Sequence, residues 1–239
     1  MQQSLKDKFD ETCLRLTQGR RFEGTGSDPI YYLVFPVRDI LTVKRQTRAW
    51  VAKLENMGWH VVTFSIGKAV NSILRGHKLR KQWLIGEKDI IAESEHKGTA
   101  LEFDEINKTL AKALSEGTEV IDMIKAKIEE ASLVVSQKGG YQYSTPHKIS
   151  KNAGFENDDS LHNQLSVVSS SANLGGLLLL TDLEVLHPYL RINSIEAQLQ
   201  GAIKCPIVVL YPGKREGKTS LRFLEFYPAD PNYRSEHIG

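Results

Sequence analysis

The hydrophobic pattern begins with an unbroken apolar run at residues 29–35, which ends at Pro36. Continuous β-branched and aromatic runs of this kind are typical of strands that are buried on both faces of a sheet. A second strand pattern covers residues 60–65, and between the two strands Val43, Trp50 and Leu54 recur among basic residues at helical spacing. The pattern predicts a strand, a helix and a strand, which is the βαβ unit of parallel sheets.

The rest of the chain continues to alternate helical and strand patterns. Helices are expected at 66–79, within 101–135 and at 189–202, and strands at 175–182, 206–211 and 220–226. Gly117 leaves open whether 101–135 is one kinked helix or two helices. The last two strands are expected to form an antiparallel hairpin at the edge of the sheet, joined by a turn at 212–217. The prediction is a three-layer α/β fold with a mostly parallel sheet.

Length and composition fit one large domain. The chain has 239 residues, of which 41% are hydrophobic and 25% are charged. These values argue against a disordered, fibrous or disulfide-rich protein. We expect residues 1–239 to form a single domain in which 84–173 is a helical and loop-rich insertion, with 139–173 as a loop and one short helix near 161–168.

Charge and cysteine content narrow the class of function. The 31 basic and 29 acidic residues give a net charge of +2, so binding to nucleic acid would require a local basic patch. Cys13 and Cys205 form no CxxC motif, and the apolar runs, such as 177–180, are far too short to cross a membrane. We expect a cytoplasmic protein with no membrane segment, no metal and no cofactor.

The segment Gly213–Thr219 looks like a phosphate-binding loop because it follows a strand and ends in Gly-Lys-Thr. It has three residues between its glycines where the motif needs four, and Pro212 offers no N–H to a phosphate. The following residues also have a strand pattern, whereas the motif must open a helix. The interpretation is a solvent-facing hairpin connection on a nucleotide-binding-like sheet without a functional P-loop.

Three polar residues follow predicted strands and form a possible strand-end ligand site: Arg38, Asp39 and Asp182. The carboxyl ends of parallel strands are where open α/β sheets bind ligands. An Asp at this position is also a common N-cap of the next helix, so both interpretations stay open. The pairs Glu93–His96 and Glu184–His187 have the i, i+3 spacing of helical metal ligands, but their context argues against a metal site.

A possible nucleic-acid-binding patch is the densest basic run, which contains Arg75, Lys78, Arg80 and Lys81. Such a patch binds phosphate backbones or acidic protein surfaces. The alternative is a solvated helix end, where cations are favoured by the helix dipole.

The order of these motifs resembles the BrxB family of BREX bacteriophage-exclusion systems. The resemblance is carried by Phe35–Asp39, Leu178–Thr181, Pro188–Arg191, Leu199–Gln200, Val209–Gly213, Gly217, Leu221, Phe223–Leu224 and Asn232–Arg234. It covers about residues 29–80 and 174–236, and the later block is the more specific part.

This resemblance implies a protein that acts in phage restriction beside a PglZ-type protein, a PglX-type methyltransferase and a BrxC-type ATPase. No nucleophile, acid/base pair or metal cluster emerged from the sequence, so we expect a non-enzymatic assembly subunit that binds a PglZ-type protein first of all. The candidate partner-binding residues are Tyr227, Tyr233 and Arg234, because tyrosine and arginine dominate interface hot spots. The alternatives are a degenerate nucleotide- or nucleic-acid-processing accessory enzyme and a DNA-contacting subunit.

Overall fold

The structure is a computed structural model of the chain. It describes residues 3–18, 29–85, 104–115, 119–136, 174–187, 189–217, 220–230 and 235–239.

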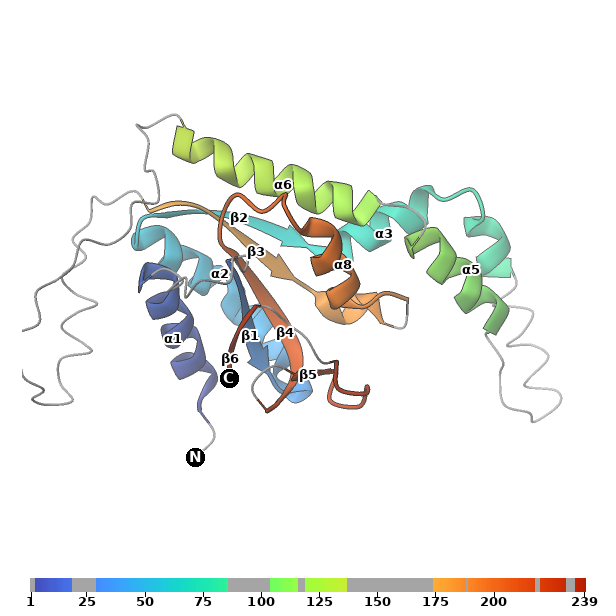
Figure 1. The fold of residues 1–239 in the computed structure, drawn as a ribbon. Helices are drawn as coiled ribbons and strands as arrows, with labels where there is room; N and C mark the ends of the chain where they lie inside the picture. Colours follow the sequence, from blue (N-terminus) through green and yellow to red (C-terminus); the bar gives the residue numbers. More distant parts are fainter. Residues whose placement is uncertain are drawn as a thin grey trace, which may run out of the picture.

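A six-stranded sheet forms the centre of the molecule (Figure 1). Its strands are β1 (Ile30–Phe35), β2 (Trp59–Ser65), β3 (Gly175–Thr181), β4 (Ile207–Glu216), β5 (Ser220–Phe223) and β6 (Glu236–Ile238). Five strands run parallel in the order β2-β3-β4-β1-β6, and β5 pairs antiparallel with the end of β4. The carboxyl ends of β2, β3, β4 and β1 therefore lie along one edge of the sheet.

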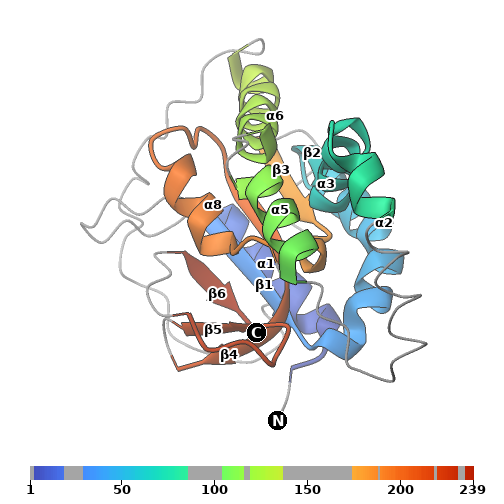
Figure 2. The same ribbon diagram turned by 90° about the vertical axis from the view of Figure 1, so that its right-hand side faces the viewer.

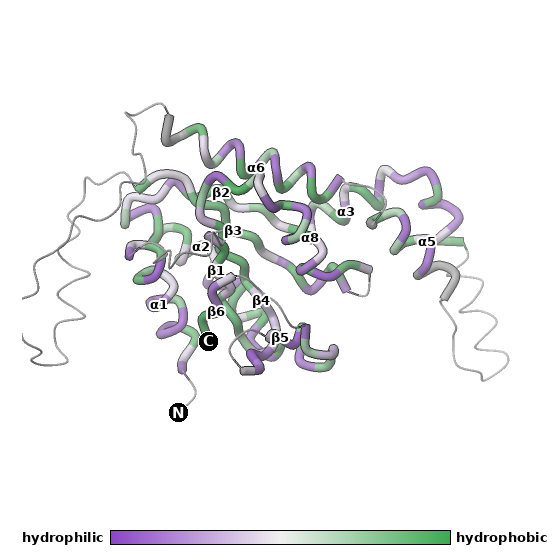
Figure 3. Tube along the Cα trace, viewed as in Figure 1, coloured by the Kyte–Doolittle hydropathy of each residue, from purple (hydrophilic) through white to green (hydrophobic). Residues whose placement is uncertain are grey.

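Helices α1 (Leu5–Gln18) and α2 (Ile40–Asn56) cover one face of this sheet. Phe9 of α1 stacks on Trp50 of α2 with ring centroids 4.6 Å apart. Every second strand residue points into this layer, including Leu177 and Leu179 of β3. Strands β1 and β3 are buried on both faces, which explains why they have no alternation with polar residues, and Figure 3 colours the tube by hydropathy.

The opposite face is covered by α3 (Ile66–Gly76), α6 (Glu119–Ser136) and α8 (Ile192–Leu199). Helix α6 crosses the sheet in contact with β3 and β2, and α5 (Asp104–Ser115) lies beyond α3 (Figures 1 and 2). The approach of α6 is closest at Gly176, where an added Cβ would lie 1.9 Å from the Ala131 carbonyl oxygen. Helix α6 falls within the predicted insertion 84–173 and yet packs directly on the sheet.

The predicted fold class is confirmed, since the sheet is mostly parallel and helices cover it. The segment 101–135 contains two helices, and the helix expected at 189–202 is limited to α8. Among the described residues, no helix has both the length and the apolar character needed to cross a bilayer.

Several predicted boundaries were wrong. The expected turn 212–217 is largely strand, because β4 continues to Glu216 and pairs there with β5. The pair does not lie at the edge of the parallel strands: β4 lies between β3 and β1, and β6 forms that edge. Strand β5 ends at Phe223 because Leu224 and Glu225 have positive φ angles of 50° and 64°. Helix α1 and strand β6 were not predicted, and the loop 139–173 with its helix near 161–168 lies outside the described residues.

Candidate functional site

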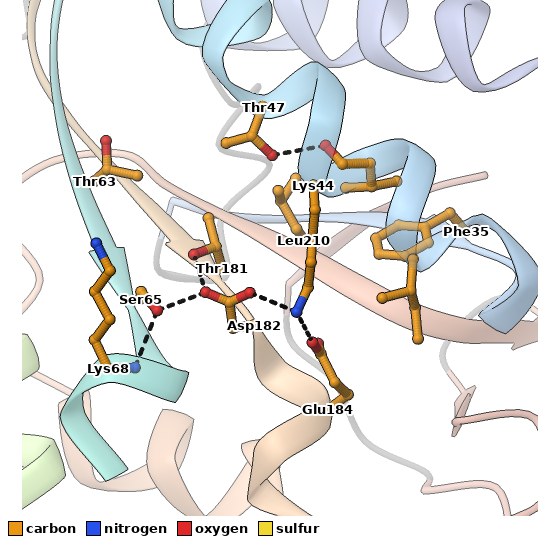
Figure 4. A pocket seen from close by; sticks show the side chains of 12 residues that line it. Phe35, Lys44, Thr47, Thr63, Ser65, Lys68, Thr181, Asp182, Glu184 and Leu210 are labelled. Atoms are coloured by element: carbon orange, nitrogen blue, oxygen red, sulfur yellow. Dashed lines mark hydrogen bonds and ion pairs between the residues drawn. The ribbon is translucent and has the colours of Figure 1, made fainter. Parts of the chain in front are cut away.

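A cavity of about 310 Å³ lies at the carboxyl ends of the parallel strands, beside α2 (Figure 4). Its apolar wall includes Phe35, Val43 and Leu210, and its polar end is built around Asp182, directly after β3. This is the edge of an open α/β sheet at which ligands commonly bind.

Asp182 is the centre of a hydrogen-bond network that joins three elements. Its Oδ2 accepts hydrogen bonds from the Ser65 hydroxyl at 2.5 Å and the Thr181 hydroxyl at 3.1 Å. Its Oδ1 pairs with Lys44 Nζ of α2 at 3.0 Å, and the same ammonium pairs with Glu184 at 2.5 Å (Figure 4). The network links the end of β2, the end of β3 and the N-terminal part of α2.

The electrostatics of this network favour charged side chains. Burial alone would raise the pKa of Asp182, but hydrogen bonds from Ser65 and Lys44 and the charge of Lys44 bring it below its usual value. For Lys44, burial opposes the charge, whereas Glu184 and Asp182 raise its pKa above the usual value. Asp182 is therefore held as a carboxylate that accepts hydrogen bonds, which is a positioning arrangement and not that of a general acid at neutral pH.

Asp39 and Asp182 do not cap a helix through their side chains, so the N-cap interpretation of these two residues was wrong. Asp182 precedes a short 3-10 helix, Leu183–Leu186, and Asp39 precedes α2, but neither carboxylate makes a cap hydrogen bond. The residue that caps a helix here is Ser65, whose hydroxyl accepts from the Lys68 backbone N–H at the start of α3.

The other two residues of the predicted strand-end site lie in a second cavity. Arg38 and Asp39 line a cavity of about 250 Å³, together with Lys8 and Ser4 of the N-terminal segment. The sequence prediction therefore placed three residues at strand ends correctly, but the structure distributes them over two cavities.

The four cations of the basic patch are all exposed. Arg75 lies near the end of α3, Lys78 in the following turn, and Arg80 and Lys81 in the helical segment that starts at residue 80. Beneath them His77 stacks on Trp83 with ring centroids 4.7 Å apart, and the Trp83 indole N–H donates to Thr109 of α5 at 3.0 Å. The basic patch therefore lies on an ordered part of the surface, because the buried Trp83 packs this segment against the rest of the protein.

The candidate partner segment is only partly described, since Tyr233 and Arg234 lie outside the described residues. Tyr227 is packed against the protein: its ring stacks on Phe223 at 6.1 Å, and its hydroxyl lies 3.3 Å from His187 Nε2. Beside it Phe226 is 63% exposed. This exposure was not predicted, since residues 220–226 have the sequence pattern of a half-exposed edge strand and Phe226 was not singled out within it.

The motifs rejected from the sequence do not gather into a site in the part of the chain that is described. Gly213 lies inside β4, whereas Lys218 and Thr219 lie outside the described residues. Glu184 pairs with Lys44, and the His187 ring packs against Tyr227. No group of three or more metal-ligating side chains occurs among the described residues.

Comparison with known proteins gives one family. Residues 79–238 match the family model described as "BREX protein BrxB". This range includes the later block of motifs that carried the resemblance, and Phe35–Asp39 lies outside it. No curated protein and no solved structure shows a significant match.

Proposed function

Because the chain belongs to the BrxB family and is thus a component of BREX phage defence, we propose that it is an assembly subunit that binds other BREX proteins and has no catalytic activity of its own. The proposed partner is a PglZ-type protein, with a BrxC-type ATPase and a PglX-type methyltransferase as alternatives.

The observation that carries this proposal is an aromatic surface in which the exposed Phe226 lies beside the half-buried His187, Arg191 and Tyr227. We call these four residues the Phe226 surface. The Phe226 ring lies 4.6 Å from the Tyr227 ring and 5.4 Å from the His187 ring, centroid to centroid. The Arg191 guanidinium lies 4.8 Å from the centroid of the Tyr227 ring. Large aromatic side chains beside an arginine are the composition of interface hot spots.

The Phe226 surface is held in place before any partner arrives. The Tyr227 backbone N–H donates to the Phe223 carbonyl at 3.3 Å, and Phe223 is buried in the core. Arg191 also pairs with Asp230 at 3.4 Å. A preorganised surface loses little conformational entropy on binding, which favours affinity.

The test is capture of the PglZ-type protein by Phe226→Ala. The matched control is Leu133→Ala on α6, because Leu133 is 59% exposed and lies on another element. We expect both variants to fold with an unchanged Tm, and only Phe226→Ala to weaken capture, by about tenfold or more in Kd. Full capture by both Phe226→Ala and Arg191→Ala would contradict the proposed surface.

The non-enzymatic part of the proposal has a separate test. Incubation of the protein with ATP or GTP and Mg²⁺ should release no phosphate, because the proposal gives the chain no catalytic activity; a phosphate-release assay measures this. Restriction that is lost in a variant with full partner capture and a normal fold would point to an enzymatic or ligand-binding role.

A second candidate function is direct DNA contact through the corner that carries Arg75, Lys78, Arg80 and Lys81. It is favoured by the exposure of all four cations, none of which has an ion-pair partner among the described residues. Phosphate contacts release counterions, so DNA retention should fall steeply with salt and should be lost when all four are changed to Gln. Equal retention by the fourfold variant would exclude this surface.

A further inference from the structure

The second cavity, of about 250 Å³, lies where the N-terminus of α1 meets the carboxyl end of β1. Its lining is mostly polar: Gln3, Ser4, Leu5, Lys8, Pro36, Arg38 and Asp39. Two cations and one carboxylate thus line a small cavity at the same edge of the sheet as Asp182.

Lys8 is the unusual member of this lining, because it is only 7% exposed. Its Nζ donates to the Val34 carbonyl of β1 at 2.9 Å. An ammonium has three N–H donors, and the described residues provide this one acceptor within hydrogen-bond distance. No described carboxylate lies within ion-pair distance of Lys8, and a buried charge without a partner is costly.

The end of β6 closes the ammonium on one side. A Cβ on Gly239 would lie 2.6 Å from the Val34 oxygen and 3.1 Å from Lys8 Nζ, so only a glycine fits between them. Lys8 also lines the cavity, so an acceptor bound in the cavity can approach its side chain from there.

Arg38 brings a second cation to the cavity. Its side chain is exposed and has no ion-pair partner among the described residues. The N-terminus of α1 adds positive potential, although Asp7 already offsets part of it by accepting hydrogen bonds from Ser4 at this end. Asp39 is the one carboxylate in the lining beside the two cations, and the Asp7 carboxylate lies behind Ser4, from which it accepts its hydrogen bonds.

We propose that this cavity binds the phosphate group of a small molecule or of a nucleic-acid end, with Lys8 and Arg38 as its donors. A compact ammonium and a planar guanidinium are the two side chains that proteins use most to bind phosphate oxygens. The cavity has room for the phosphate group, and any organic part must extend through its opening. Inorganic phosphate, a nucleoside monophosphate and a 5′-phosphorylated DNA end share this chemistry.

The ionisation of Lys8 agrees with such a site. Burial lowers the pKa of Lys8, and the charge of Asp39 only partly opposes this. A bound dianion would favour the protonated ammonium and would raise this pKa again.

The experiment is calorimetric titration of the full chain, at constant ionic strength, with inorganic phosphate, AMP and a 5′-phosphorylated oligonucleotide. The variants are Lys8→Met and Arg38→Gln, and the control is Arg48→Gln, an exposed arginine of α2 outside this cavity. We expect binding by the wild type and by the control, and a Kd about tenfold or more higher in each variant. Lys8→Met should remain folded in phosphate-free buffer, because its apolar side chain replaces a buried ammonium.

Two results would overturn the proposal. One is that none of the three probes binds the wild type. The other is that all four proteins bind or are stabilised equally, which is the general salt effect of phosphate. If Lys8→Met fails to fold, the Kd values of Arg38→Gln and Arg48→Gln still test the proposal, because only Arg38 lines the cavity. Tighter binding of AMP or of the oligonucleotide than of inorganic phosphate would support the site and identify the source of the phosphate.

Discussion

Asp182 is a single residue on which three elements depend. Its backbone has φ 60° and ψ 40°, a left-handed conformation that Asp and Asn tolerate better than other side chains. This turn directs the carboxylate toward Ser65, Thr181 and Lys44. Lys44 would otherwise be an ordinary surface cation of α2, and here it holds the helix to the end of β3.

We predict that Asp182→Asn destabilises the protein by about 1–2 kcal/mol, because it removes charge-assisted hydrogen bonds and keeps the backbone conformation. The measurement is urea unfolding at pH 7, with Glu55→Gln, an exposed carboxylate of α2, as the control. A loss no larger than that of the control would mean that the network contributes nothing to stability.

The destabilisation caused by Asp182→Asn should also depend on pH in the acid range. The folded pKa of Asp182 lies below its ordinary value of 3.8, so its stabilisation is present above that value and is lost as pH falls through the folded pKa. The difference in unfolding free energy between wild type and Asp182→Asn should therefore shrink below about pH 4. A difference that stays constant from pH 7 to pH 3 would contradict the lowered pKa.

The lowered pKa of Lys8 predicts a change in the stability of the protein at alkaline pH. Its folded pKa is below 10.5, so the unfolded chain holds the proton more tightly and stability rises as pH increases from the folded pKa toward 10.5. Lys8→Met should lack this rise, which unfolding curves of both proteins at pH 7–10 would measure. Parallel curves would show that burial does not perturb Lys8.

Asp182 and Lys8 differ in whether their positions in the fold could be predicted from the sequence. Asp182 was predictable as a strand-end residue because strand ends follow from hydropathy. Lys8 was not predictable, since a lysine in an amphipathic helix normally faces solvent. Its burial comes from a contact with Val34, 26 residues away in the chain, that only the folded structure provides.

At the scale of elements, the fit between α6 and β3 depends on Gly176. An Ala there would place its Cβ 1.9 Å from the Ala131 carbonyl oxygen, which is a backbone atom and cannot rotate away. We predict that Gly176→Ala costs about 3 kcal/mol or more, at the upper end of overpacking costs. The control is Gly76→Ala, whose Cβ would meet nothing within 4 Å and which should leave the free energy of unfolding within about 0.5 kcal/mol. Equal stabilities of the two variants would exclude the close packing.

The elements that sequence located best were those with the strongest patterns: β3 from its continuous apolar run, and the helical region of α5 and α6 from its periodicity, although Gly117 left open whether that region is one helix or two. Pro212 and Gly213 looked like a turn because both residues disfavour regular strands. They lie within β4 because Gly213 lets β5 approach closely: a Cβ there would lie 2.3 Å from the Arg222 carbonyl oxygen. Strand β6 has three residues, which is too short for a periodic pattern, and its place beside β1 is set by tertiary packing.

At the scale of the whole molecule, the folded core includes residues that lie before the range matched by the family model. The family model covers residues 79–238, but β1 and β2 belong to the same sheet and lie outside that range. Strand β1 separates β4 from β6, so the matched residues alone leave a gap in the order of strands. Helices α1 and α2, which cover one face, are also outside the range.

We therefore predict that a fragment of residues 79–239 does not fold by itself. Without α1 and α2 it would expose Leu177, Leu179, Val208 and Leu210, which are each at most 3% exposed in the full chain, and without β1 it would leave β4 and β6 unpaired on that side. Exposed apolar area of this kind drives aggregation, so the fragment should elute as aggregates and show no cooperative unfolding, in contrast to the full chain. Adding residues 1–78 during refolding should restore a soluble complex, because every missing contact of the sheet comes from them. A monodisperse fragment with a cooperative transition would show instead that residues 79–239 are a domain of their own and that the single-domain expectation was wrong.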